Sequence, residues 1–162
     1  MSFAMPLRAE PLKAFLENPI FLSSVSSWLF AQLIKAVILV LRSRNKSLRD
    51  VVETMIWRTG GMPSSHAALV SAMATSIAFL EGLGSNLFQL SLFFALLTMR
   101  DAMGVRRSSG LQAKALNILG RQVSDHIQGE FHPIKEVNGH APLEVVIGAL
   151  LGVFIAAAFV FL

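Results

Sequence analysis

The chain has 162 residues, of which 54% are hydrophobic and 15% charged, and its mean hydropathy is +0.60. This composition is too apolar for an ordinary soluble domain and indicates a membrane protein with a single domain, residues 1–162. The absence of cysteine excludes disulfides and thiol catalysis. The net charge of +4 comes from basic residues that flank apolar segments, so we expect an anionic phospholipid bilayer as a partner and no nucleic acid.

The N-terminal part of the chain joins an interfacial segment to a spanning one. Residues 1–18 mix apolar and charged side chains, which predicts a short helix at the membrane interface. The apolar segment Pro19–Leu41 has the roughly 20 residues that a spanning helix needs. Lys35 is the charged residue within it, and Arg42 follows two helical turns later on the same face. Lys35 either reaches the lipid headgroups or faces a polar site, and both interpretations stay open.

The segment Gly60–His66, with the sequence GGMPSSH, predicts a tight turn that enters a helix. A helix start offers unpaired N–H groups and the positive end of the helix dipole, and the hydroxyls of Ser64 and Ser65 add donors beside them. This combination suits a phosphate oxygen. His66 then stands in the first turn, where it could transfer a proton. The alternative is an ordinary capped helix with a histidine in its first turn.

Three further apolar segments complete the predicted bundle. The second span runs from about Ser64 to Leu80 and is rich in small residues, the third runs from Leu87 to about Met99, and the last is Pro142–Leu162. The polar segment Arg100–His140 predicts an amphipathic helix that lies at the membrane face. We therefore predict an all-α fold, a polytopic transmembrane helical bundle with about four spanning helices plus short interfacial helices.

Four spans place the candidate polar residues at one face of the membrane. The two loops that carry most of the lysine and arginine fall on the same side, which by the positive-inside tendency is cytoplasmic. We therefore expect an integral protein of the cytoplasmic membrane whose site lies at the cytoplasmic face. The residues gathered there are Lys35, Arg42, His66, Asp101, Arg106, Arg107, His140 and Glu144.

His140 and Glu144 are four residues apart at the start of the last span, which is one helical turn. A carboxylate at this spacing can accept from one ring nitrogen and hold the other in the neutral, nucleophilic tautomer. Such pairs are also common at ordinary helix starts. Together with His66 and the cations, however, the pair completes the set that in-line displacement at phosphorus needs: a nucleophile, a proton donor for the leaving oxygen, and positive charge around the equatorial oxygens.

These motifs resemble the type 2 phosphatidic acid phosphatase superfamily of lipid phosphatases and vanadium haloperoxidases, and most closely its short divergent branch. Lys35 and Arg42 keep the spacing of the first superfamily motif, with serine following in place of proline. Pro63–His66 matches the second motif with serine in place of glycine. His140 and Glu144 keep the spacing of histidine and acid in the third motif, with glutamate for aspartate.

The third motif departs further from the superfamily pattern. Ile134 occupies the position, six residues before His140, where the superfamily has an arginine, so Arg106 or Arg107 would supply that charge instead. The segment between the second and third motifs is similar to that of the divergent branch in the residues Asp101–Arg107, Gln112, Ala113 and Asn117.

The resemblance implies a phosphatase-like helical bundle in residues 19–162 that hydrolyses phosphomonoesters or diphosphates without a metal or another cofactor. It implies that His140 is the nucleophile that forms a phosphohistidine, that His66 protonates the leaving alkoxide, and that Glu144 orients His140. The residues that would hold the phosphate oxygens are Lys35, Arg42, Ser64, Ser65, Arg106 and Arg107. Asp101 either pairs with one of these arginines or stands within the site itself.

Three functions stay open at this point. The first is hydrolysis of a membrane lipid phosphate, namely phosphatidic acid, phosphatidylglycerol phosphate or a polyprenyl diphosphate, and a cytoplasmic site favours the first two. The second is a non-catalytic membrane protein that binds anionic lipid headgroups. The third is a metal site of His66, His140, Glu144 and Asp101, which has no compact ligand spacing and lies among cations that would repel a metal ion. A bundle this small also leaves a homo-oligomer open.

Overall fold

The computed structural model describes residues 9–42, 61–136 and 139–161. The described residues form six helices and contain no strand, which confirms the predicted all-α fold. The helices are α1 (Ala9–Leu16), α2 (Pro19–Arg42), α4 (Ser65–Glu81), α5 (Asn86–Met103), α6 (Val105–Ile127) and α7 (Pro142–Phe161).

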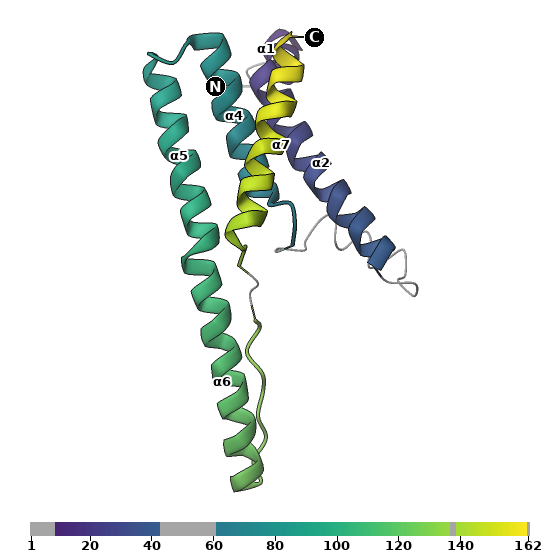
Figure 1. The fold of residues 1–162 in the computed structure, drawn as a ribbon, viewed down its shortest axis with the longest axis vertical. Coiled ribbons are helices and arrows are strands. Elements are labelled where there is room, and N and C mark those ends of the chain that lie inside the picture. The colour runs from purple at the N-terminus through teal and green to yellow at the C-terminus, as the bar shows by residue number, and fades with distance from the viewer. Residues whose placement is uncertain (1–8, 43–60, 137–138, 162) are drawn as a thin grey trace, which may run out of the picture.

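Helix α4 is the centre of the bundle and packs against α2, α5 and α7 (Figure 1). Its buried residues are small except for two, Val70 and Ile77; the small ones are Ser65, Ala67, Ala68, Ser71, Ala72, Ala74 and Ser76. Helix α7 approaches it closely, because a Cβ added to Gly148 would lie 2.3 Å from the carbonyl oxygen of Ser64, and one added to Gly152 would lie 2.2 Å from that of Ala68. Small residues therefore bring the two backbones into contact, as is typical of helices that pack in lipid.

Three helical segments of the described chain are long and apolar enough to cross a membrane: Pro19–Leu41 in α2, α5 with its continuation into α6, and α7. Large apolar side chains cover their outer faces, and Phe93 and Phe154 are 68% and 72% exposed. A continuous apolar exterior suits lipid chains rather than water. Helix α4, with 17 residues, is shorter than α2, α5 and α7 and packs against all three. The transmembrane bundle is therefore confirmed.

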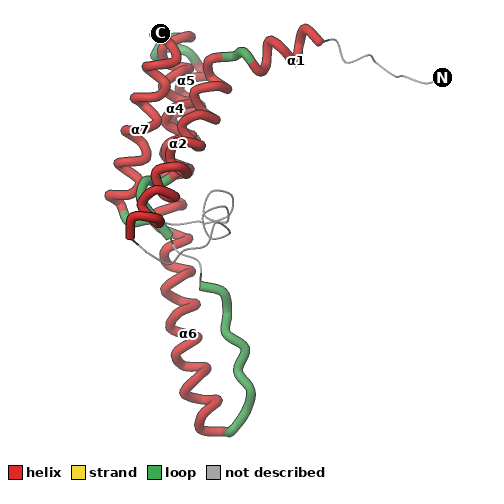
Figure 2. Tube along the Cα trace, turned by 90° about the vertical axis from the view of Figure 1, so that its right-hand side faces the viewer, coloured by secondary structure: helices red, strands yellow, loops and turns green. Residues whose placement is uncertain are grey.

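Helix α6 corrects one prediction. The amphipathic helix between the last two spans exists, but it does not lie across the end of the bundle. It continues in the direction of α5 and extends beyond the bundle (Figures 1 and 2). The hydrogen bonds from the Gly104 N–H to the Arg100 carbonyl, 2.8 Å, and from the Ser108 N–H to the Gly104 carbonyl, 2.9 Å, carry the backbone through the junction without a sharp turn.

Helix α1 is the described part of the predicted interfacial segment, residues 1–18, and it projects sideways from the bundle (Figure 2). Its apolar side chains Leu12, Phe15 and Leu16 are exposed. The ring of Phe15 packs on that of Phe21 in α2, with the centroids 4.5 Å apart. An apolar face held beside the first span fits a position at the membrane interface.

Candidate functional site

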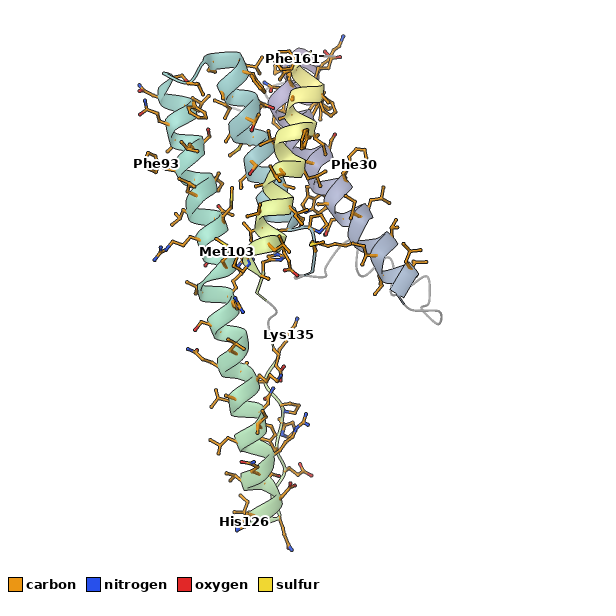
Figure 3. The ribbon with its side chains drawn as sticks, viewed as in Figure 1. Phe30, Phe93, Met103, His126, Lys135 and Phe161 are labelled. Atoms are coloured by element: carbon orange, nitrogen blue, oxygen red, sulfur yellow. The ribbon has the colours of Figure 1, made fainter. Side chains whose placement is uncertain are left out.

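Three parts of the chain meet at one end of the bundle: the start of α4, the junction of α5 and α6, and the start of α7. Two main-chain hydrogen bonds fasten them together. The Ser64 N–H donates to the Glu144 carbonyl at 2.9 Å, and the His140 N–H donates to the Ala102 carbonyl at 3.1 Å. In Figure 3, Met103 at the end of α5 lies level with the first turn of α7. The starts of α4 and α7 are therefore held in contact by their own backbones.

The predicted turn and helix start are present. Gly61 has a φ of 82°, Ser64 is the N-cap of α4, and its hydroxyl accepts from the Ala67 N–H at 3.3 Å. Ser64 and Ser65 are both buried, and His66 is partly exposed in the first turn. Gly60 lies outside the described residues. Both serines thus stand buried at the helix start, as predicted, and the Ser64 hydroxyl caps the helix.

Lys35 reaches the same helix start from α2. It is only 6% exposed, and its Nζ donates to the hydroxyl of Ser65 at 3.3 Å. Lys35 is expected from the sequence either to reach the lipid headgroups or to face a polar site. The structure supports the second interpretation, because an ammonium that reached the headgroups would not be buried against Ser65. Arg42 ends the same helix, and its side chain lies outside the described part of the chain.

His140 and Glu144 form a direct contact one turn apart. The Nδ1 of His140 lies 3.0 Å from Oε2 of Glu144, and this oxygen also accepts from the Ala141 N–H at 3.1 Å. His140 is 4% exposed. A carboxylate on Nδ1 favours the tautomer in which Nδ1 carries the proton and Nε2 carries the free lone pair. The geometry therefore leaves Nε2 as the atom of this ring that can attack.

His66 and His140 converge although they are far apart in the sequence. His66 interacts electrostatically with Arg106, His140, Lys35 and Asp101, and Lys35 interacts with Glu144. These side chains come from α2, α4, α7 and the region where α5 passes into α6. Two imidazoles and two cations thus lie near one another at this end of the bundle. Such a set can bind an anion and move a proton beside it.

Asp101 and Arg106 form an ion pair in which Nε of Arg106 donates to Oδ2 of Asp101 at 2.8 Å. Both side chains are about half exposed. The carboxylate therefore limits the directions that the guanidinium can take. Of the two roles considered for Asp101, this is the pairing with an arginine. Arg107 is exposed, and its main chain packs against Gly139, where a Cβ would lie 2.4 Å from the Arg107 nitrogen.

The hypothesis of a metal site finds no ligand cluster in the part of the chain that the structure describes. No three histidine, aspartate or glutamate side chains gather there in a way that could hold a metal ion. His126 stands at the far end of α6 (Figure 3), and His132 is exposed in the segment that follows.

The sequence does not predict the main-chain hydrogen bonds that Ser64, Ala102 and Glu144 make at the site. No sequence signal could have singled these residues out, because every residue carries main-chain groups.

The fold and these side chains define a membrane-embedded helical protein with a polar, cationic site of two histidines at the end of its bundle. The chain belongs to the Divergent PAP2 family, which it matches over residues 16–155. It is also 38% identical over 151 residues to the uncharacterized membrane protein YuiD of Bacillus subtilis (strain 168), a match that covers 86% of this chain and 92% of YuiD. No solved structure matches the chain.

Proposed function

We propose that this protein is an integral-membrane lipid phosphate phosphatase that acts through a phosphohistidine on His140. The observation that carries the proposal is the electrostatic interaction of His66 with His140, at the point where the Ser64 N–H donates to the Glu144 carbonyl and joins the starts of α4 and α7. Neither Lys35 nor His140 is more than 6% exposed, so their polar atoms would meet a substrate in a largely desolvated site. In such a site a charge-assisted hydrogen bond is strong.

The first step is attack by His140 on phosphorus. Its Nε2 lone pair forms the P–N bond while the bond from phosphorus to the lipid oxygen breaks, and the proton of His66 passes to that oxygen. The imidazole becomes cationic, and the Glu144 carboxylate on Nδ1 stabilises it. Lys35, Arg106 and the N–H groups at the start of α4 neutralise the equatorial oxygens, which carry the charge in the transition state.

The second step regenerates the protein. A water gives its proton to the now neutral His66 and attacks phosphorus, and the P–N bond breaks to release phosphate and neutral His140. The same histidine therefore acts first as acid and then as base. Arg42, Ser64, Ser65 and Arg107 complete the proposed set of phosphate contacts. No step needs a metal or another cofactor.

The place of the site in the bundle suits a lipid substrate. Its side chains lie where apolar helices end, so a headgroup phosphate could enter while the acyl or prenyl tail stays among the apolar outer faces. Phosphatidic acid, phosphatidylglycerol phosphate and a polyprenyl diphosphate all have this form. A cytoplasmic orientation of the site, which the distribution of lysine and arginine favours, would favour the first two.

The direct test is turnover by the purified protein in detergent, measured as phosphate release from each of these three lipids with EDTA present. We expect release from at least one of them. A protein that binds vesicles of phosphatidic acid and never releases phosphate would contradict the proposal and indicate the non-catalytic alternative. Release that EDTA abolishes would indicate a metal enzyme instead.

Lys35→Met is expected to raise the KM for the lipid phosphate by about tenfold or more, because a charge-assisted hydrogen bond contributes about 1.5–3 kcal/mol. Methionine has a similar length and carries no charge, so the packing of α2 on α4 should survive. The measurement is steady-state kinetics beside a matched control, Lys114→Met, which removes an exposed lysine of α6. Equal KM values in the two variants would exclude Lys35 from the phosphate site.

A further inference from the structure

The connection between α6 and α7, residues 128–141, turns back and runs along α6 towards the bundle (Figures 1 and 2). We call this segment the return strap, and the structure describes its residues 128–136 and 139–141. His140 is its penultimate residue. The position of the proposed nucleophile therefore depends on where the strap is attached.

Asn117 attaches the strap with every polar group of its side chain. Its Nδ2 donates to the Ile134 carbonyl at 2.8 Å and to Oε1 of Glu136 at 3.0 Å, and its Oδ1 accepts from the Ile134 N–H at 2.8 Å. The residue is 5% exposed on a helix that is otherwise largely exposed. A buried amide that pairs with both main-chain groups of one residue fixes that residue in one register, since a shift of the strap would leave the amide unpaired.

Close packing at Gly120 and Gly139, on either side of the Asn117 contact, supports the same register. A Cβ added to Gly120 would lie 2.1 Å from the ring of Phe131, and one added to Gly139 would lie 2.4 Å from the main chain of Arg107. The contacts of the strap thus follow α6 in antiparallel order, at Gly120, Asn117 and Arg107. They end where the His140 N–H meets the Ala102 carbonyl in α5.

The distances leave the strap little freedom. The contact points Asn117 and Arg107 are ten residues apart in α6, which corresponds to about 15 Å along the helix axis. The described residues Ile134 and Gly139 contact these two points, and a chain of five residues reaches at most about 17 Å. A strap held at Ile134 can therefore deliver His140 to only a narrow range of positions.

We infer that Asn117 is a positioning residue for His140: by fixing Ile134 on α6, it sets the register of the strap that delivers the imidazole to the site. The inference rests on the proposed function for the role of His140. Asn117 itself stays remote from the substrate and acts through the strap. The chain thus uses α6, the helix that extends beyond the bundle, as a rigid support for a segment of its site.

The first test is kinetic. We expect Asn117→Ala to lower kcat for phosphatidic acid by about tenfold or more, because a small displacement of a reacting group costs rate, while KM changes less than about threefold because the phosphate-binding cations stay in place. Ser124→Ala is the matched control, since the Ser124 hydroxyl donates to the Gly129 carbonyl at the far end of the strap. It should keep the wild-type kcat. Gly120→Ala should lower kcat in the same way. Alanine is a good helix former, so α6 should stay intact, but the new Cβ would push the ring of Phe131 away from the helix.

The second test needs no turnover. Diethyl pyrocarbonate modifies accessible imidazoles, and mass spectrometry of peptides separates the four histidines. Buried His140 should react slowly in the wild type and in Ser124→Ala and several times faster in Asn117→Ala, whereas exposed His132 should react fast in all three. If His140 is labelled faster in Asn117→Ala but the wild type never releases phosphate, the proposed phosphatase function is refuted, and the attachment of the strap by Asn117 is supported. Unchanged kcat and unchanged labelling in Asn117→Ala would refute the positioning role.

Discussion

His140→Ala is expected to lower phosphate release by on the order of 10⁴-fold or more, because removal of the proposed covalent nucleophile leaves no route through a phosphoenzyme. The contact of Nδ1 with Glu144 leaves Nε2 as the atom proposed to attack. Alanine removes that atom without adding a charge or a clash in this buried position. The measurement is phosphate release from the lipid that the wild type turns over fastest, with the amount of folded protein matched by circular dichroism.

The control for this variant is His132→Ala, which removes an exposed imidazole of the same strap and should behave as the wild type. His140→Ala should also keep its affinity for vesicles that contain phosphatidic acid, since the cations proposed to bind the headgroup stay in place. Turnover within about tenfold of the wild type would show that His140 is not the nucleophile.

Gly148→Ala is the substitution outside the reacting groups with the largest expected effect. The new Cβ would lie 2.3 Å from the Ser64 carbonyl oxygen and 3.0 Å from its nitrogen, so α7 would have to move away from the start of α4. That movement strains or breaks the bond from the Ser64 N–H to the Glu144 carbonyl and separates His66 from His140. We expect kcat to fall by about 100-fold, the usual cost of a displacement of about 1 Å, and stability to fall by about 1–3 kcal/mol.

Gly84→Ala provides the comparison, since an added Cβ at Gly84 has no neighbour within 4 Å. It should keep both the activity and the thermal stability of the wild type. The two variants carry the same chemical change, so a difference between them reports the contact of α7 with α4. A Gly148→Ala protein as active as Gly84→Ala would show that this contact does not hold the site together.

The helices could be predicted from the sequence because apolar length is a strong signal in a membrane protein. The segment Pro19–Leu41 agrees with α2 within one residue, and Pro142 begins the last helix as expected. The direction of α6 could not be predicted in the same way. Its amphipathic pattern fits both a helix at a membrane surface and a helix that carries a returning strap on one side. The direction of α6 is set by the main-chain hydrogen bonds on either side of Gly104, which the pattern does not indicate.

The candidate site could be predicted in its residue types and spacing but not in its assembly. The contact of His140 with Glu144, four residues later, is indicated by their spacing at a helix start, and so are the serines at the start of α4. The approach of α4 to α7 follows from glycines whose partners lie about eighty residues away in the chain. Asn117 carries no pattern that marks its role, because an asparagine in an exposed helix is ordinary until its partner Ile134 is known.

The most direct measurement of the central claim is to trap the phosphoenzyme. The purified protein is incubated briefly with phosphatidic acid, phosphatidylglycerol phosphate or polyprenyl diphosphate labelled with ³²P in the released phosphate, with EDTA present, and is quenched in alkali. We predict an alkali-stable, acid-labile label on the peptide that contains His140, and its loss on a chase with unlabelled lipid. Phosphate release that passes through a label on another residue, or no release and no label with any of these lipids, would contradict the account.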